Sequence, residues 1–155
     1  MSRLATSYLG LELRSPLVAS AGPFTRQPES ALRLQESGAA AIVLPSLFEE
    51  EVVNEEVELS RALEQGAENF AEALDYFPAV DAFESTADRY LATVVRMKER
   101  LDVPVIASLN ATSSGGWVRY AKLIEEAGAD ALELNLYRLA ADPARRGSEI
   151  ETSDL

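Results

Sequence analysis

Short apolar segments recur along the chain and alternate with longer amphipathic ones. The apolar segments are rich in Val, Ile, Leu and Ala, and turn residues bound them, as is typical of β-strands. This pattern predicts strands at 17–21, 40–44, 103–109 and 131–136. Helical character follows in three intervals, 28–37, 86–100 and 116–127. Strands that alternate with helices indicate an α/β fold with a parallel sheet.

The joints between helix and strand repeat in sequence. Residues 36–40 read Glu-Ser-Gly-Ala-Ala and residues 126–130 read Glu-Ala-Gly-Ala-Asp. A glycine just after the last periodic residue is a helix stop, so Gly38 and Gly128 end their helices. Pro45 is predicted to end the second strand. The repetition supports successive β/α units.

Two segments depart from the repeat. Residues 8–13, Tyr-Leu-Gly-Leu-Glu-Leu, predict a small N-terminal β-hairpin. Residues 46–85 form a long insertion after the second strand, with an acidic helical first part and an aromatic loop at 76–80. A connection of this length in a compact domain is typical of a lid or substrate loop.

Polar side chains gather at the carboxyl ends of the predicted strands. Leucines at 132, 134 and 136 put Glu133 and Asn135 together on the opposite face of the fourth strand. Both faces of a parallel sheet are covered, so we expect Glu133 to be buried and to make a structural hydrogen bond. Ser108 and Asn110 share one face at the end of the third strand, and Ser20 and Ser46 stand at the ends of the first and second.

These polar ends favour a (β/α) TIM-barrel architecture over a doubly wound sheet, because barrel strand ends converge at one mouth where sites are built. The first turn has no Gly-x-Gly-x-x-Gly, which argues against a dinucleotide-binding unit. About four β/α units are present, so residues 1–155 are predicted to form a single domain equal to the N-terminal half of a barrel. Its open edges would pair with a missing C-terminal half or with another copy as a homo-oligomer.

The amino-acid composition argues against several classes of function. The net charge is -12 and there is no basic stripe, which argues against nucleic acid. No apolar run is long enough to span a membrane. The lack of cysteine fits a cytoplasmic protein, and the lack of histidine removes the usual general base. The acidic stretch 49–75 favours a solvated helix over a metal site, since its carboxylates show no ligand spacing; no metal is predicted.

Three strand motifs and the hairpin together resemble the dihydroorotate dehydrogenase family. They are Pro-Leu-Val-Ala-Ser-Ala-Gly-Pro at 16–23, Ile-Ala-Ser-Leu-Asn at 106–110, Glu-Leu-Asn-Leu at 133–136, and the hairpin at 8–13. The resemblance runs along the whole chain but covers only the first half of the family's barrel. It implies an FMN-dependent (β/α)₈ oxidoreductase that oxidises dihydroorotate, or a related small-molecule substrate, in pyrimidine synthesis. By position it implies flavin-binding roles for Ala19, Ser20, Ser46, Asn110 and Asn135.

The chain departs from the family where the catalytic base is expected. The family places a Cys or Ser base in a motif like Asn-Leu-Ser-Cys-Pro-Asn, whereas residues 135–140 read Asn-Leu-Tyr-Arg-Leu-Ala. Tyr137 is then the candidate base, with a lowered pKa. Leu44 stands where the family has a flavin-contacting lysine, and only Pro78 remains of its substrate loop. We therefore predict that the isolated chain binds FMN weakly or not at all and is inactive alone.

Two other functions remain open. A half-barrel with exposed strand edges is also suited to a non-catalytic role as an assembly or interaction module. An aldolase-type barrel is a weaker alternative, because it needs a lysine at a strand end. Lys98 and Lys122 both fall in predicted helices.

Overall fold

The structure is a computed structural model that describes residues 4–69, 84–136, 143–144 and 146–149. It begins with an antiparallel hairpin, β1 (Thr6–Tyr8) and β2 (Leu11–Leu13). Tyr8 pairs with Leu11, so the turn has two residues, Leu9 and Gly10, with φ of 54° and 77°. Such a turn matches the strand twist and favours Asn-Gly, so Leu9 adopts a costly conformation. The predicted hairpin is confirmed.

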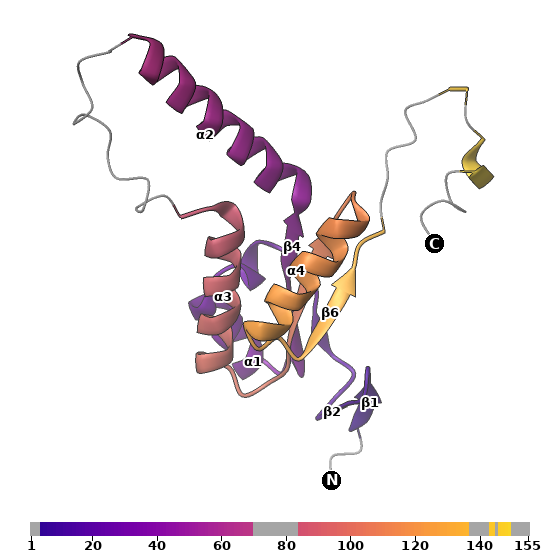
Figure 1. The fold of residues 1–155 in the computed structure, drawn as a ribbon. Coiled ribbons are helices and arrows are strands. Elements are labelled where there is room, and N and C mark those ends of the chain that lie inside the picture. The colour runs from indigo at the N-terminus through magenta and orange to yellow at the C-terminus, as the bar shows by residue number, and fades with distance from the viewer. Residues whose placement is uncertain (1–3, 70–83, 137–142, 145, 150–155) are drawn as a thin grey trace.

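A parallel sheet of four strands follows in the order β3-β4-β5-β6 (Figure 1). The strands are β3 (Val18–Ala19), β4 (Ala41–Phe48), β5 (Val105–Asn110) and β6 (Ala131–Leu134). The helices between them are η1 (Pro23–Thr25), α1 (Pro28–Glu36), α2 (Glu49–Asn69), α3 (Thr86–Arg100) and α4 (Ser114–Glu126). The α/β fold is confirmed, with each strand next to its successor in sequence, and the described residues form an open sheet.

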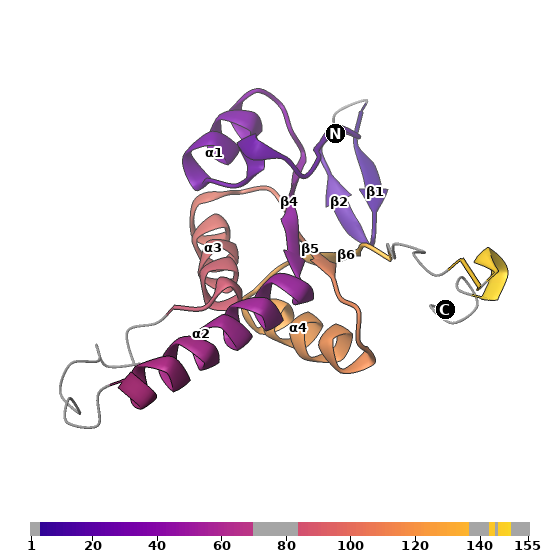
Figure 2. The same ribbon diagram turned by 90° about the horizontal axis from the view of Figure 1, so that it is seen from above.

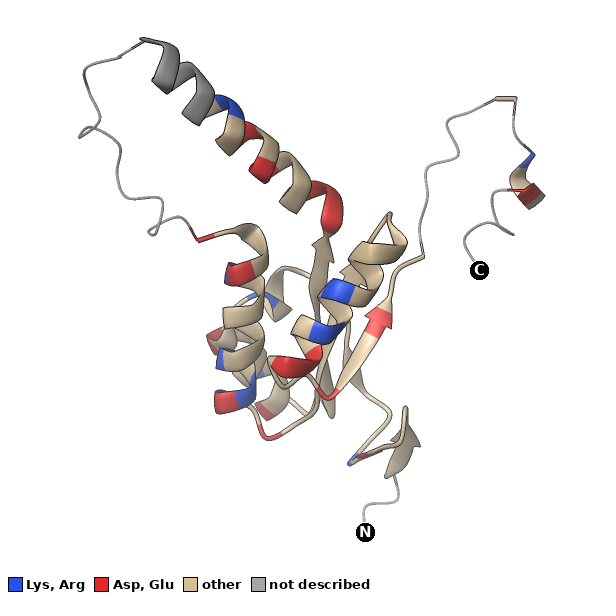
Figure 3. Cartoon of the chain, viewed as in Figure 1, with Lys and Arg blue, Asp and Glu red and all other residues tan. Residues whose placement is uncertain are grey.

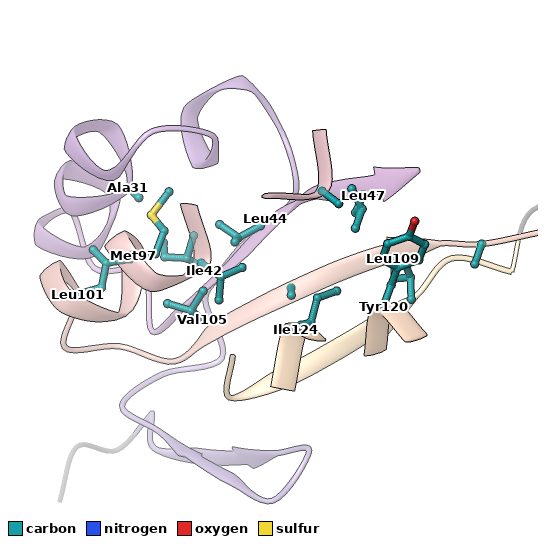
Figure 4. Close-up of a cluster of buried hydrophobic side chains, with 14 of the residues drawn as sticks. Ala31, Ile42, Leu44, Leu47, Met97, Leu101, Val105, Leu109, Tyr120 and Ile124 are labelled. Atoms are coloured by element: carbon teal, nitrogen blue, oxygen red, sulfur yellow. The ribbon is translucent and has the colours of Figure 1, made fainter. Parts of the chain in front are cut away.

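Helices α1, α3 and α4 all pack on one face of this sheet, which we call the covered face (Figure 2). When every crossover has the same hand and adds the next strand, the helices are left on one side. The covered face forms the main core (Figure 4). Its strand residues are Ile42, Leu44, Leu47, Val105, Ala107 and Leu109, and its helix residues include Ala31, Val94, Met97, Tyr120 and Ile124.

The opposite side of the sheet, which we call the inner face, carries the alternate residues. A small second core joins Val43 and Ile106 to Leu13 of the hairpin. Ala41 also lies in this core, near the start of β4, so the hairpin covers the amino-terminal end of the inner face. The carboxyl end of that face has no layer over it within the described residues, as Figures 1 and 2 show.

Most predicted elements are confirmed, with shifts at their ends. Helix α3 begins and ends at the predicted residues, whereas α4 begins two residues early because Ser113 caps it. Gly38 and Gly128 follow their helices with φ of 113° and 92°, a conformation that glycine adopts without strain. The first and fourth strands are shorter than predicted, so Ser20 and Asn135 directly follow β3 and β6.

The predicted end of the second strand at Pro45 is wrong. Strand β4 runs through Pro45 to Phe48, and its register against β5 shifts between Val43 and Ser46. Proline has no N–H to give to a ladder, and a bulge is one of the few places where a strand tolerates it. Ser46 therefore lies inside the strand rather than after it.

Helix α2 projects from the carboxyl end of β4 away from the sheet (Figures 1 and 2). Its first turn holds Glu49, Glu50 and Glu51, and acidic residues continue along its described length (Figure 3). The helical, acidic character predicted for the start of the insertion is confirmed. The loop predicted at 76–80 lies outside the described residues. Among the helices that the structure describes, none is long and apolar enough to cross a membrane.

Candidate functional site

The bulge in β4 decides which way Ser46 points. Leu44 and Leu47 are both buried in the covered-face core although they are three positions apart. Strict alternation would have put residues 42, 44, 46 and 48 on one face. The extra residue reverses the pattern after Pro45, so Ser46 joins the inner face, where it is in register with Ser108.

A row of hydrogen bonds then crosses three strands on the inner face. The hydroxyl oxygens of Ser46 and Ser108 are 2.7 Å apart, and Ser108 Oγ donates to Glu133 Oε1 over 2.9 Å. A serine hydroxyl has one proton. Because Ser108 donates it to Glu133, the Ser108 oxygen accepts the hydrogen bond from the Ser46 hydroxyl. We call Ser46, Ser108 and Glu133 the polar row. Its hydroxyl dipoles are aligned toward the Glu133 carboxylate.

Tyr90 of α3 supports the polar row from behind. Ser108 N–H donates to Tyr90 Oη over 2.9 Å, and the Tyr90 hydroxyl donates to the Ser108 carbonyl over 3.0 Å. These backbone groups lie beside the register shift in β4, and the phenol serves them there as both acceptor and donor. Burial, together with the charge of Glu133, raises the pKa of Tyr90 to about 12, and the hydroxyl stays protonated at neutral pH.

A second polar cluster joins α2 to the amino end of α4. Both carboxylate oxygens of Glu49 accept hydrogen bonds from the loop after β5. Oε2 accepts from the backbone N–H of Thr112 at 2.7 Å and of Ser113 at 2.9 Å, and Oε1 accepts from Ser113 Oγ at 2.5 Å. The Glu49 side chain is buried. A carboxylate is stabilised there because the helix amino terminus presents unpaired N–H groups and positive potential.

Gly116 leaves the room that this carboxylate needs. A Cβ at Gly116 would lie 2.2 Å from Glu49 Oε1 and 2.4 Å from Oε2, which no real side chain can do. Burial raises the pKa of Glu49, but the hydrogen bonds from Ser113 and Thr112 outweigh it and leave the pKa below its ordinary value. The chain's own carboxylate therefore fills the anion-binding end of α4.

A cavity of about 600 Å³ lies over the inner face. The hairpin closes one end of it with Tyr8, Leu9 and Leu13, and the strands supply its floor, including Ser20, Val43, Ile106 and Glu133. Glu133 is exposed rather than buried, so the prediction of a buried glutamate is wrong. Its predicted hydrogen bond within the sheet is present. The reason for the exposure is that no described layer covers this end of the inner face.

The two predicted amides lie at the carboxyl end of β5 and β6. Asn110 is buried at the last position of β5, on the same face as Ser108. Asn135 follows β6, its side chain is half-buried, and its backbone N–H donates to the Leu109 carbonyl over 2.9 Å. The alternation of β6 puts Asn135 on the side of Glu133. Asn110 thus shares a face with Ser108, and Asn135 follows the strand of Glu133, but neither amide lines the cavity.

Two other predicted site residues are placed differently. Ala19 packs against the covered-face core, so its methyl group points away from the cavity, and only its backbone can approach a ligand there. Ser20, one residue later, lines the cavity and is exposed. Tyr137, the predicted base, lies outside the described residues. Among the residues that are described, no group of three or more acidic side chains is arranged to hold a metal ion.

Sequence reasoning missed Tyr90 and Glu49 as parts of this region. Glu49 was one of many carboxylates in an acidic helix, and nothing local distinguishes it. Pro45 did carry a signal, because a proline inside an apolar β-pattern indicates a bulge as well as an end. A bulge at that point would have turned Ser46 inward and left a gap for a side chain such as Tyr90.

Comparisons with known proteins give one informative relative. A scan against models of protein families finds no match. The chain is 30% identical over 144 residues to a Thermoplasma acidophilum protein named dihydroorotate dehydrogenase B (NAD(+)), catalytic subunit. The alignment covers 88% of this chain but 42% of that relative. Together with the α/β fold, this similarity supports a distant relationship to the dihydroorotate dehydrogenases, which are oxidoreductases.

Proposed function

We propose that this chain is the amino-terminal part of a (β/α)₈ flavoprotein, an FMN-dependent oxidoreductase of the dihydroorotate dehydrogenase type. The observation that carries the proposal is the similarity to the Thermoplasma protein along 88% of the chain. The fold supports it, since parallel strands in sequential order with helices on one face are the units from which such a barrel closes. Binding sites in barrels lie at the carboxyl ends of the strands, where the amides and the polar row are found.

The described residues suit the ring system of a flavin. Carboxamides at Asn110 and Asn135 offer both donors and acceptors, which match the alternating carbonyl and N–H groups of a pyrimidine-like edge. Ser20 adds a hydroxyl from the wall of the cavity, and the two amides lie at the carboxyl ends of β5 and β6. A bound flavin would supply hydride acceptance, and the residues of this chain would orient its ring and exclude water from it.

The phosphate of FMN has no comparable place among the described residues. The amino terminus of α4 is the natural anion site at this end of the sheet, and Glu49 already fills it. The chain should therefore recognise the ring and not the phosphate. The substrate would be dihydroorotate or a related compound with a CH–CH bond next to polar groups, and Tyr137 is the candidate base.

Flavin titration of the isolated chain tests the proposal. Riboflavin, which has no phosphate, and FMN should bind weakly and with Kd values within about threefold of each other, or less than 1 kcal/mol apart. Asn110→Ala and Asn135→Ala should each weaken both flavins, whereas Asn54→Ala on exposed α2 is the matched control. Binding of FMN much tighter than that of riboflavin, or equal effects of all three variants, would contradict the proposal. A dihydroorotate oxidation assay should show no turnover by the chain alone.

A second function, an assembly module without catalysis, is favoured by the inner face. The cavity there is open, and Tyr8, Leu9 and Leu134 on its walls are each more than half exposed. Exposed apolar surface of this kind marks interaction sites. Specific flavin binding that depends on Asn110 and Asn135 favours the oxidoreductase, and partner binding unaffected by those amides favours the module.

A further inference from the structure

Helix α2 meets the rest of the chain along one stripe of its surface. Glu49, Val52 and Glu55 follow one another at intervals of three residues, which places them on one side of a helix. Among the α2 side chains that the structure describes, those of residues 49–62, Val52 is the one buried apolar side chain. A surface helix is ordinarily held by a broad apolar stripe. Here a carboxylate lies on either side of a single valine, so charge carries much of the attachment.

Each of these two carboxylates binds the amino end of a different helix. Glu49 accepts hydrogen bonds from backbone N–H groups and a serine hydroxyl in the loop directly before α4. Glu55 Oε2 accepts from the backbone N–H of Thr86, the first residue of α3, at 2.6 Å, and Glu55 Oε1 accepts from Arg89 at 3.1 Å. The amino end of a helix favours an ionised acceptor. We call Glu49 and Glu55 the carboxylate latch, because they hold α2 to α4 and α3.

Helices α3 and α4 do not depend on the latch for their own caps. Ser85 caps α3 by accepting a hydrogen bond from the Asp88 N–H at 3.1 Å, and Asp88 Oδ2 accepts from the Ser85 N–H in return. Ser113 caps α4 by accepting from the Gly116 N–H at 2.9 Å. Both helices also pack in the main core. Loss of the latch therefore leaves α3 and α4 capped and packed.

The charged and titratable side chains around the latch come from four elements. They are Asp88 and Arg89 of α3, Arg119 and Tyr120 of α4, Glu51 and Glu56 of α2, and Arg26 at the end of η1. Arg89 is the cation that pairs directly with Glu55, whereas the hydrogen bonds to Glu49 come from N–H and O–H groups. The attraction therefore runs from an ionised α2 to Arg89 and to the two helix ends.

Protonation of the latch removes this attraction. The hydrogen bond from the Thr86 N–H lowers the pKa of Glu55 despite partial burial, and Arg89 lowers it further. The pKa of Glu49 also lies below its ordinary value of 4.5. Both pKa values are thus lower in the attached helix than in a released one. The latch holds above the released pKa and weakens as pH falls through the attached values.

We propose that α2 is released as a unit when the latch loses its charge, while the sheet, α3 and α4 stay folded. Helix α2 follows β4 without a break, so its release moves the segment that leaves the carboxyl end of the sheet. Barrels build their binding sites at that end, and the latch therefore sets how the chain beside such a site is placed. This inference rests on the contacts of α2 and stands whether or not the chain binds a flavin.

Amide hydrogen exchange of the full chain tests the release. The double variant Glu49→Gln/Glu55→Gln removes both charges at nearly constant size. At pH 7 its α2 amides should exchange at least about tenfold faster than in the wild-type chain, because a detached helix is marginal in water. Amides of β4 and β5 should keep their wild-type protection. Fluorescence of Trp117, the single tryptophan, in the first turns of α4, should change in the same variant.

The matched control is Glu50→Gln/Glu58→Gln, which removes two charges from exposed positions on the same helix. Its α2 amides should exchange within about twofold of the wild-type rate. Acidification is a second test that needs no variant. Below about pH 4, wild-type α2 should lose protection before β5, after correction for intrinsic exchange rates. The proposal is overturned if the latch variant exchanges like the control, or if β5 loses protection together with α2.

Discussion

The two faces of the sheet are built from the same strands and differ in what completes them. On the covered face, Ile42, Val105 and Leu109 are fully buried beneath α1, α3 and α4. On the inner face, the hydrogen-bonded row ends at an exposed glutamate beside an open cavity. Stability and chemistry are therefore separated in this chain. The covered face carries the main core, whereas the inner face carries the polar groups and has no layer over its carboxyl end within the described residues.

The largest expected effect comes from the covered face. Leu109→Ala should lower the free energy of unfolding by about 2–5 kcal/mol, since it removes a fully buried side chain and leaves a cavity. Leu134→Ala is the matched change at the residue in register with Leu109 on the edge strand β6, where the side chain lines the cavity and is already exposed, and should cost about 0.5 kcal/mol or less. Urea denaturation measures both. Equal losses would mean that the inner face is covered in solution.

A neighbouring pair of glycines tests the Glu49 cluster. Gly116→Ala should cost about 2–4 kcal/mol, because its Cβ would displace the buried carboxylate from its hydrogen bonds. Gly115→Ala meets nothing within 4 Å and lies in the first turn of the same helix, so it should stabilise the chain by up to about 1 kcal/mol. Thermal or urea denaturation measures the stability of both variants. Equal changes in the free energy of unfolding would contradict this placement of Glu49.

The stability of the chain should depend on pH through the ionisation of the Glu49 carboxylate. The pKa of Glu49 is lower in the folded chain than in the unfolded chain, so its stabilisation is present above the unfolded pKa and is lost as pH falls through the folded pKa. Glu49→Gln should cost about 1–3 kcal/mol at pH 7. The difference between wild type and E49Q should shrink below about pH 4. A difference that does not vary with pH would show that ionised Glu49 does not hold α4.

Tyr90 links the two faces, because it packs in the covered layer and holds the backbone of the polar row. Tyr90→Phe should cost about 1–3 kcal/mol, since two backbone groups of Ser108 lose their partner. Amide exchange at Ser108 should speed up at the same time. Tyr8→Phe, on the exposed hairpin, is the control and should change stability by less than about 0.5 kcal/mol. Unchanged exchange at Ser108 would rule out the bridging role.

The smallest expected effect has the opposite sign. Leu9 has a φ of 54°, which is unfavourable for a leucine, and it precedes Gly10 in the hairpin turn. Leu9→Asn creates the Asn-Gly pair that this turn prefers and should stabilise the chain by about 0.5–1 kcal/mol. Leu11→Asn, in the strand after the turn, is the control and should destabilise the chain. A destabilising Leu9→Asn would indicate that packing of the Leu9 side chain outweighs the strain of its backbone.

Local patterns predicted most elements because each rests on neighbouring residues. The stops at Gly38 and Gly128 and the full extent of α3 could be predicted, since caps and periodicity act within a few residues. The grouping of Ser108 with Asn110 followed from alternation along one strand. Alternation failed for Ser46, because a single inserted residue reverses the face of everything after it.

The sequence by itself determined the β/α repeat, the hairpin, the acidic α2 and the side of the sheet on which Glu133 lies. These features follow from the period of the hydrophobic positions, from the turn residues and from the composition. Only the tertiary structure decided that Ser46 faces Ser108, that Tyr90 bonds the backbone of Ser108, and that Glu49 holds the end of α4. The physical reason is distance along the chain. Each of these contacts joins residues far apart in sequence, and its geometry exists only when the strands and helices are packed together.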